Sequence, residues 1–128
     1  MLEFLIVGIG GSVGSCLRFA LTKSMHHFAV SLPLGTLISN IIAGIFIGFF
    51  IGLEESVFSL SPRAKLFLTT GLCGGLSTFS TFSLETVVFF SEGKYVVAVL
   101  NIILNLGISI LGVIVGMTIA KLLFKKGI

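Results

Sequence analysis

Residues 71–83 read Gly-Leu-Cys-Gly-Gly-Leu-Ser-Thr-Phe-Ser-Thr-Phe-Ser and interrupt an otherwise apolar part of the chain. The stretch holds three glycines, five hydroxyl side chains and two phenylalanines three positions apart. Lipid hydrocarbon offers no hydrogen-bond partners, so irregular backbone at membrane depth persists only inside protein or beside a wet cavity. The sequence therefore predicts that a membrane-spanning helix breaks here, at its glycines, and that the break belongs to a functional site.

The composition of the whole chain is that of a membrane protein. Of its 128 residues, 55% are hydrophobic and only 10% are charged, and the mean hydropathy is +1.20. A span of the hydrocarbon core takes about 20 apolar residues, so this length accommodates four spans and no separate soluble domain. We therefore predict an all-α protein of the cell's inner membrane, with one four-helix domain covering residues 1–128. The predicted spans are residues 2–25, 33–53, 62–90 and 95–124.

Small residues recur at helical spacing inside these spans. Gly44, Gly48 and Gly52 follow one another at intervals of four in the second span. Small residues let membrane helices approach closely, so this stripe predicts helix packing and not a ligand site. Ser61-Pro62 is a helix start signal and places the beginning of the third span.

Polar residues within the spans are the candidates for function. Asn40 lies in mid-span, where it either bonds a neighbouring helix or donates hydrogen bonds to an anion. Asn101, Asn105 and Ser109 fall at intervals of four on one helix face, a pattern that favours a polar pathway over interhelical bonds alone. Arg18 either extends to the membrane surface or attracts anions to a vestibule.

The aromatic residues of the opening stretch extend this interpretation. Phe79 and Phe82 share a helix face, with Ser80 and Thr81 between them. The edge of a phenyl ring is electropositive, so rings and hydroxyls together can replace part of a small anion's hydration without holding it tightly. This combination of phenyl rings and hydroxyl side chains predicts a path for an anion.

Neither catalysis nor a metal site built from cysteine and histidine side chains is expected. Cys16 and Cys73 lie in apolar runs outside any metal-binding spacing, and both are expected to be buried thiols. His26-His27 follows the first apolar run, and adjacent histidines point to different helix faces, so they make a poor metal site. The small net charge of +3 suits contact with anionic lipid better than nucleic-acid binding. We therefore expect no enzyme and no nucleic-acid partner.

The loop charges favour one orientation without excluding the other. Four spans put both termini on one side, which collects five cations against two on the other side, and an excess of cations favours the cytoplasm. Without the three C-terminal lysines the count is two against two, so insertion in both orientations is also permitted. The five cations are Arg63, Lys65, Lys121, Lys125 and Lys126, and the two are Lys23 and Lys94.

These motifs also match a known family. Gly71–Glu85 closely resembles the signature of the small fluoride channels (Fluc, also called CrcB), and so do Gly11-Ser-Val-Gly14-Ser-Cys-Leu-Arg18 and Pro33-Leu-Gly-Thr-Leu-Ile-Ser-Asn40. The resemblance covers three spans by motif. It implies an antiparallel, dual-topology dimer with two fluoride pores, in which the partner is a second copy of the chain or a paired homologous subunit. It also implies passive export of cytoplasmic fluoride.

The resemblance assigns roles to particular positions. Phe79 and Phe82 would line the pore, and Asn40 would contact fluoride beside them. A structural sodium ion at the dimer centre would be bound by the backbone carbonyls of Gly74 and Ser77. Arg18 would lie at the vestibule, and the remaining polar track would consist of Ser80, Thr81, Asn101, Asn105 and Ser109.

One alternative is a proton-coupled exporter of the small multidrug type, which is also a short four-span protein. Such an exporter needs a membrane-embedded acid. The only acidic residue of the first span is Glu3, which lies at its N-terminal end and not in mid-membrane. Glu85 is therefore the remaining candidate.

Overall fold

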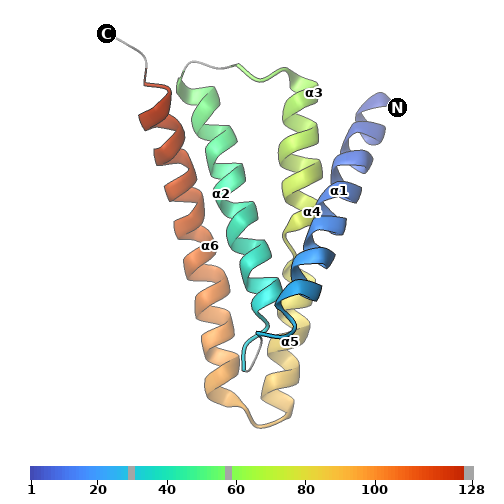
Figure 1. Cartoon of the computed structure of the whole chain (residues 1–128), viewed down its shortest axis with the longest axis vertical. Helices are drawn as coiled ribbons and strands as arrows, with labels where there is room; N and C mark the ends of the chain where they lie inside the picture. Colours follow the sequence, from blue (N-terminus) through green and yellow to red (C-terminus); the bar gives the residue numbers. More distant parts are fainter. Residues whose placement is uncertain (29–30, 57–58, 126–128) are drawn as a thin grey trace.

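The computed structural model describes residues 1–28, 31–56 and 59–125, and these residues form helices with no strand (Figure 1). Lys126, one of the cations in the charge comparison, lies outside the described residues. Four helical stretches are long and apolar enough to cross a membrane, which confirms the prediction of a multi-pass membrane protein. The elements in order are α1 (Leu2–Met25), α2 (Leu34–Ser56), α3 (Pro62–Lys65), η1 (Leu66–Cys73), α4 (Gly74–Leu76), α5 (Phe79–Ser91) and α6 (Tyr95–Leu123).

The helices run roughly along one common direction (Figure 1). The beginning of α1 and the end of α6 lie at the same end of the bundle. Helix α2 packs along α6, and α1 packs against η1 and α4. At the opposite end of the bundle, α5 lies beside α6.

Glycines bring α2 and α6 together at backbone distance. A side-chain carbon at Gly48 would collide with the carbonyl oxygen of Val113, and one at Gly116 would collide with that of Ile45. Backbones this close allow dense van der Waals packing in a solvent that provides little hydrophobic drive for association. The predicted packing stripe on the second span is therefore confirmed.

The glycines of the opening stretch also serve packing, which corrects the prediction that they end the helix. Gly71, Gly74 and Gly75 are all helical, in η1 and α4. A carbon added at Gly71 would lie 3.0 Å from the Cα of Gly10, and one at Gly75 would strike the carbonyl oxygen of Gly11. Gly71 and Gly75 therefore let α1 approach, whereas a carbon added at Gly74 would meet only the Thr69 carbonyl oxygen, at 3.9 Å. The extended residues come after all three glycines. Ser77 has φ −80° and ψ 156°, and Thr78 has φ −150° and ψ 120°.

Segment η1 is a π-helix, in which the backbone bonds run from residue i to residue i+5. It spans eight residues and leads directly into α4. Such segments are rare and often occur at functional sites. Nothing in the sequence predicted it.

The end of α2 carries two ion pairs. The helix reaches Ser56, although the sequence predicted an end at Leu53 and a loop over residues 54–61. Glu54 pairs with Lys65 at 2.8 Å, and Glu55 pairs with Lys121 at 2.7 Å. The two adjacent carboxylates therefore join the end of α2 to α3 and α6. At the start of α3, Ser61 Oγ accepts a hydrogen bond from the Ala64 amide at 3.2 Å, as its predicted capping role requires.

Candidate functional site

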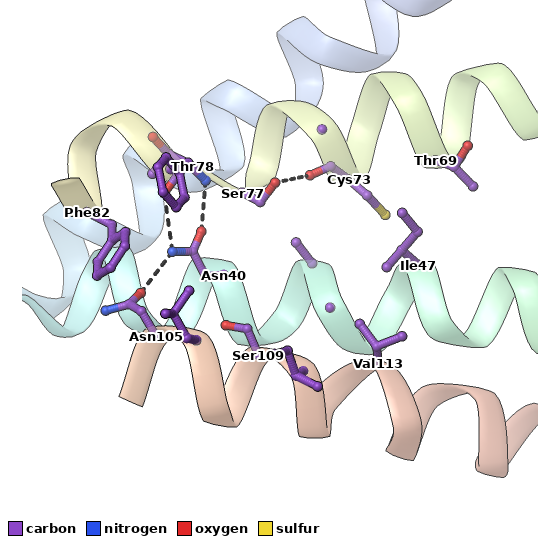
Figure 2. Close-up of a pocket in the computed structure, with 16 residues that line it drawn as sticks. Asn40, Ile47, Thr69, Cys73, Ser77, Thr78, Phe82, Asn105, Ser109 and Val113 are labelled. Atoms are coloured by element: carbon purple, nitrogen blue, oxygen red, sulfur yellow. Dashed lines mark hydrogen bonds between the residues drawn. The ribbon is translucent and has the colours of Figure 1, made fainter. Parts of the chain in front are cut away.

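An open cavity of about 390 Å³ lies between α2, α6 and the third span (Figure 2). It is lined by several of the residues that the sequence analysis singled out: Asn40, Gly74, Ser77, Phe79, Phe82, Asn105 and Ser109. Four other candidates are not among its lining residues: Arg18, Ser80, Thr81 and Asn101.

Asn40 is the centre of the polar contacts in this cavity. Its Oδ1 accepts a hydrogen bond from the Thr78 amide at 2.8 Å. Its Nδ2 donates to the Thr78 carbonyl at 3.3 Å and to Asn105 Oδ1 at 2.9 Å (Figure 2). Asn40 thus pairs with both backbone groups of an extended residue and also reaches α6. The interhelical role that the sequence left open is present in the structure.

Thr78 changes the backbone hydrogen bonds around the two extended residues, Ser77 and Thr78. In a continuous helix its amide would bond the Gly74 carbonyl, and the Thr81 amide would bond the Ser77 carbonyl. Instead the Thr78 amide bonds Asn40, and the Thr81 amide bonds Thr78 Oγ1 at 3.2 Å. The two carbonyls thereby lose their helical partners. Sequence reasoning missed Thr78, although a threonine just before a helical run is a recognisable N-cap signal.

The asparagines of α6 continue the network away from the cavity. Asn105 Nδ2 donates to the backbone oxygen and to Oδ1 of Asn101, each at 3.0 Å. Asn101 Nδ2 donates to Thr86 Oγ1 at 3.0 Å, and the Thr86 hydroxyl donates to the Phe82 carbonyl at 2.8 Å. Asn101 is only 1% exposed. The predicted polar stripe therefore links α2, α6 and α5 through hydrogen bonds.

Ser109 differs from Asn101 and Asn105, which precede it on α6. Its Oγ is buried, lines the cavity and has no hydrogen-bond partner among the described residues. A hydroxyl can always donate one hydrogen bond. Ser109 is therefore a donor at the cavity wall that is available to a ligand.

The two phenyl rings meet edge to face. Their centroids lie 5.5 Å apart with an interplanar angle of 67°. Phe82 is buried, whereas Phe79 is 73% exposed, so one ring belongs to the interior and the other to the surface of the single chain. Ser80 and Thr81 lie within hydrogen-bond distance of Thr78 Oγ1, at 3.4 Å and 3.0 Å, and so belong to the capping region.

Arg18 reaches the opening stretch from α1. Its Nε donates to the Gly75 carbonyl at 3.2 Å. The carbonyl belongs to the last turn before the extended residues, so the guanidinium holds this turn from α1, whereas Asn40 holds Thr78 from α2. The bond through Nε leaves the terminal nitrogens of Arg18 as further donors.

Glu85 is a membrane-embedded acid that lies outside the cavity lining. Its Oε1 accepts a hydrogen bond from the Thr36 hydroxyl at 2.6 Å. Its Oε2 is buried without a hydrogen-bond partner among the described residues. The contact with Thr36, which joins α5 to α2, could not be predicted from the sequence pattern.

Four helical stretches that are long and apolar enough to cross a membrane, three of which border a cavity with amides, hydroxyls and phenyl rings in its lining, define a small multi-pass membrane protein. The family model described as "CrcB-like protein, Camphor Resistance (CrcB)" matches residues 5–117, and the chain belongs to this family. The "Fluoride-specific ion channel FluC" of Clostridium perfringens (strain ATCC 13124) is 44% identical over 125 residues, which cover 97% of this chain and 98% of that protein. The protein of the same name from Clostridium novyi (strain NT) is 42% identical over 121 residues, covering 94% of each chain.

Proposed function

We propose that this chain is a fluoride-selective ion channel through which fluoride leaves the cytoplasm passively. The observation that carries the proposal is the close relation to fluoride-specific channels over nearly the whole chain. The cavity supplies chemistry that suits a small anion, because two phenyl rings, whose edges are electropositive, and a free hydroxyl line it, and no charged residue is among its described lining residues. As a channel, the chain is not an enzyme.

The proposed pathway uses the residues of the cavity and their neighbours. Phe79 and Phe82 present ring edges, and Asn40 contacts the anion beside them. Arg18 raises the anion concentration at the vestibule. The remaining polar track is formed by Ser80, Thr81, Asn101, Asn105 and Ser109.

We propose that the pathway is completed by a second chain in the opposite orientation. In support, the cavity is open along one side and the large ring of Phe79 is 73% exposed. A partner that covered this ring would enclose the cavity. The partner is a second copy or a paired homologous subunit, and two related pores follow from the symmetry of an antiparallel pair.

We propose that a structural sodium ion binds the backbone carbonyls of Gly74, in α4, and of Ser77, in the extended segment. The carbonyls of Gly74 and Ser77 lack their helical partners, because the Thr78 and Thr81 amides bond elsewhere. Unwound backbone carbonyls are suitable ligands for sodium in membrane proteins. A bound ion would supply positive charge that stabilises the freed carbonyls at the dimer centre.

The exporter alternative finds less support. The chain belongs to the CrcB-like family, and its relatives are named as channels. Glu85, the acid that an exporter would need, lies outside the lining of the cavity.

Reconstitution into liposomes tests the proposed function. Purified protein in sodium buffer is expected to release trapped potassium fluoride rapidly once a potassium ionophore is added, while trapped chloride is retained. A fluoride electrode and a chloride electrode measure the two anions in the same preparation. Folded, sodium-containing dimer without fluoride flux would overturn the proposal.

A further inference from the structure

The amide group of Asn40 has no hydrogen to spare for an anion. A carboxamide has two N–H bonds, and here one is directed to the Thr78 carbonyl at 3.3 Å and the other to Asn105 Oδ1 at 2.9 Å. An anion that contacts Asn40 must therefore displace one of these acceptors. The bond to the Thr78 carbonyl belongs to the pair of bonds that holds the extended segment, so Asn105 is the acceptor that can be exchanged.

Backbone groups at both ends fix the direction of this network. The Thr78 amide can only donate, so Asn40 must turn Oδ1 toward it and Nδ2 toward Asn105. The Asn101 carbonyl can only accept, so Asn105 must turn Nδ2 toward it and Oδ1 toward Asn40. Amide orientations usually rest on the surrounding hydrogen-bond pattern, and here each end of the pattern admits one solution. Asn105 thus presents an oxygen to Asn40 (Figure 2).

We propose that Asn105 is an internal competitor for the anion. Its carboxamide oxygen occupies the Asn40 N–H that fluoride takes in the proposed function, on which this inference rests. Each binding event then exchanges one hydrogen bond for another, which weakens the net affinity. Conduction requires an anion to bind well enough to enter and weakly enough to leave, and Asn105 sets this balance.

Replacing Asn105 with leucine tests the competition, because leucine has a similar size and no acceptor. Asn105→Leu frees the Asn40 N–H, and fluoride is expected to half-saturate the channel at a concentration about fivefold lower, the factor that corresponds to one typical hydrogen bond. The maximal flux per channel is expected to fall, because the anion dissociates more slowly. The half-saturating concentration is measured from flux into liposomes over a fluoride series.

Thr86→Val is the matched control. It removes another link of the network, the acceptor of Asn101 Nδ2, and leaves the contact between Asn40 and Asn105 in place. This variant is expected to be less stable and to keep the half-saturating concentration of the unmodified chain. A shift of the same size in Thr86→Val would overturn the proposal, because general loosening of the network would then explain both results.

A second variant addresses folding. Asn105→Leu leaves the buried Oδ1 of Asn101 without its Asn105 donor, which is costly. The double variant Asn101→Leu/Asn105→Leu removes that oxygen as well and still frees Asn40. An unchanged or higher half-saturating concentration in the folded single or double variant contradicts the competition while the channel function stands. An unmodified dimer without fluoride flux contradicts the proposed function itself.

Discussion

Replacing Gly44 with alanine is expected to force α2 and α6 apart at the cavity. The added carbon would lie 2.7 Å from the carbonyl oxygen of Ser109 and 3.6 Å from Val113 Cγ2. A close but tolerable carbon–oxygen contact is about 3.3 Å. The helices must therefore separate locally by about 0.6 Å, the difference between these two distances. Backbone cannot turn aside as a flexible side chain does, so the strain falls on the whole helix pair.

The cost of this separation follows from overpacking in well-packed interiors. Such substitutions typically destabilise by about 1–3 kcal/mol, which for a chain of this size lowers the unfolding midpoint by on the order of 5 °C. Because Gly44 and Ser109 both line the cavity, fluoride flux is expected to fall as well. Circular dichroism at 222 nm during heating measures the midpoint, and liposome efflux measures the flux.

Gly107→Ala is the control, because a carbon added there meets nothing within 4 Å in the chain. Alanine is favoured over glycine in a helix by about 1 kcal/mol, so this variant is expected to be as stable as the original chain or slightly more stable. The result that would refute the reasoning is an equal loss of stability in both variants. An unchanged midpoint in Gly44→Ala would refute it too.

Two further predictions concern the segment around the extended residues. Arg18→Met removes the bond to the Gly75 carbonyl and is expected to destabilise the chain by about 1.5–3 kcal/mol, the range for a hydrogen bond to a charged group; the thermal midpoint measures it, and an unchanged midpoint would contradict the contact. Thr78→Val removes the cap of α5 and is expected to cost about 0.5–2 kcal/mol and to speed hydrogen exchange of the Thr81 amide, whereas Thr78→Ser keeps the cap. Equal exchange in the two Thr78 variants would contradict the capping role.

The sequence predicts the helices well because each has a strong local cause. The apolar runs are long enough to span a bilayer, and the stripe of Gly44, Gly48 and Gly52 indicates a packing face directly. The π-helix η1 has no such cause in the sequence. Its wider turns coincide with the close contact of Gly71 with α1, and contacts between distant segments are not visible in local periodicity.

The residues of the cavity are also predicted better than their contacts. Asn40, Phe82, Asn105 and Ser109 stand out because each is an unusual side chain at its place in an apolar span, or lies beside one. The direction of the asparagine network could not be predicted, because it depends on which backbone groups meet the amides in space. The same limit applies to Thr78, whose importance follows from two bonds to Asn40 across 38 positions of sequence.

Because of the ion pairs at the end of α2, the charges that act during membrane insertion differ from the charges of the folded protein. Glu54 and Glu55 pair with Lys65 and Lys121 only once three helices have assembled. During insertion those lysines act as free cations, and acidic residues contribute little to the choice of orientation. After folding, each lysine is matched by a carboxylate, so its charge is largely neutralised at the surface. The charges that orient the chain in the membrane therefore differ from those that the finished protein presents to lipid.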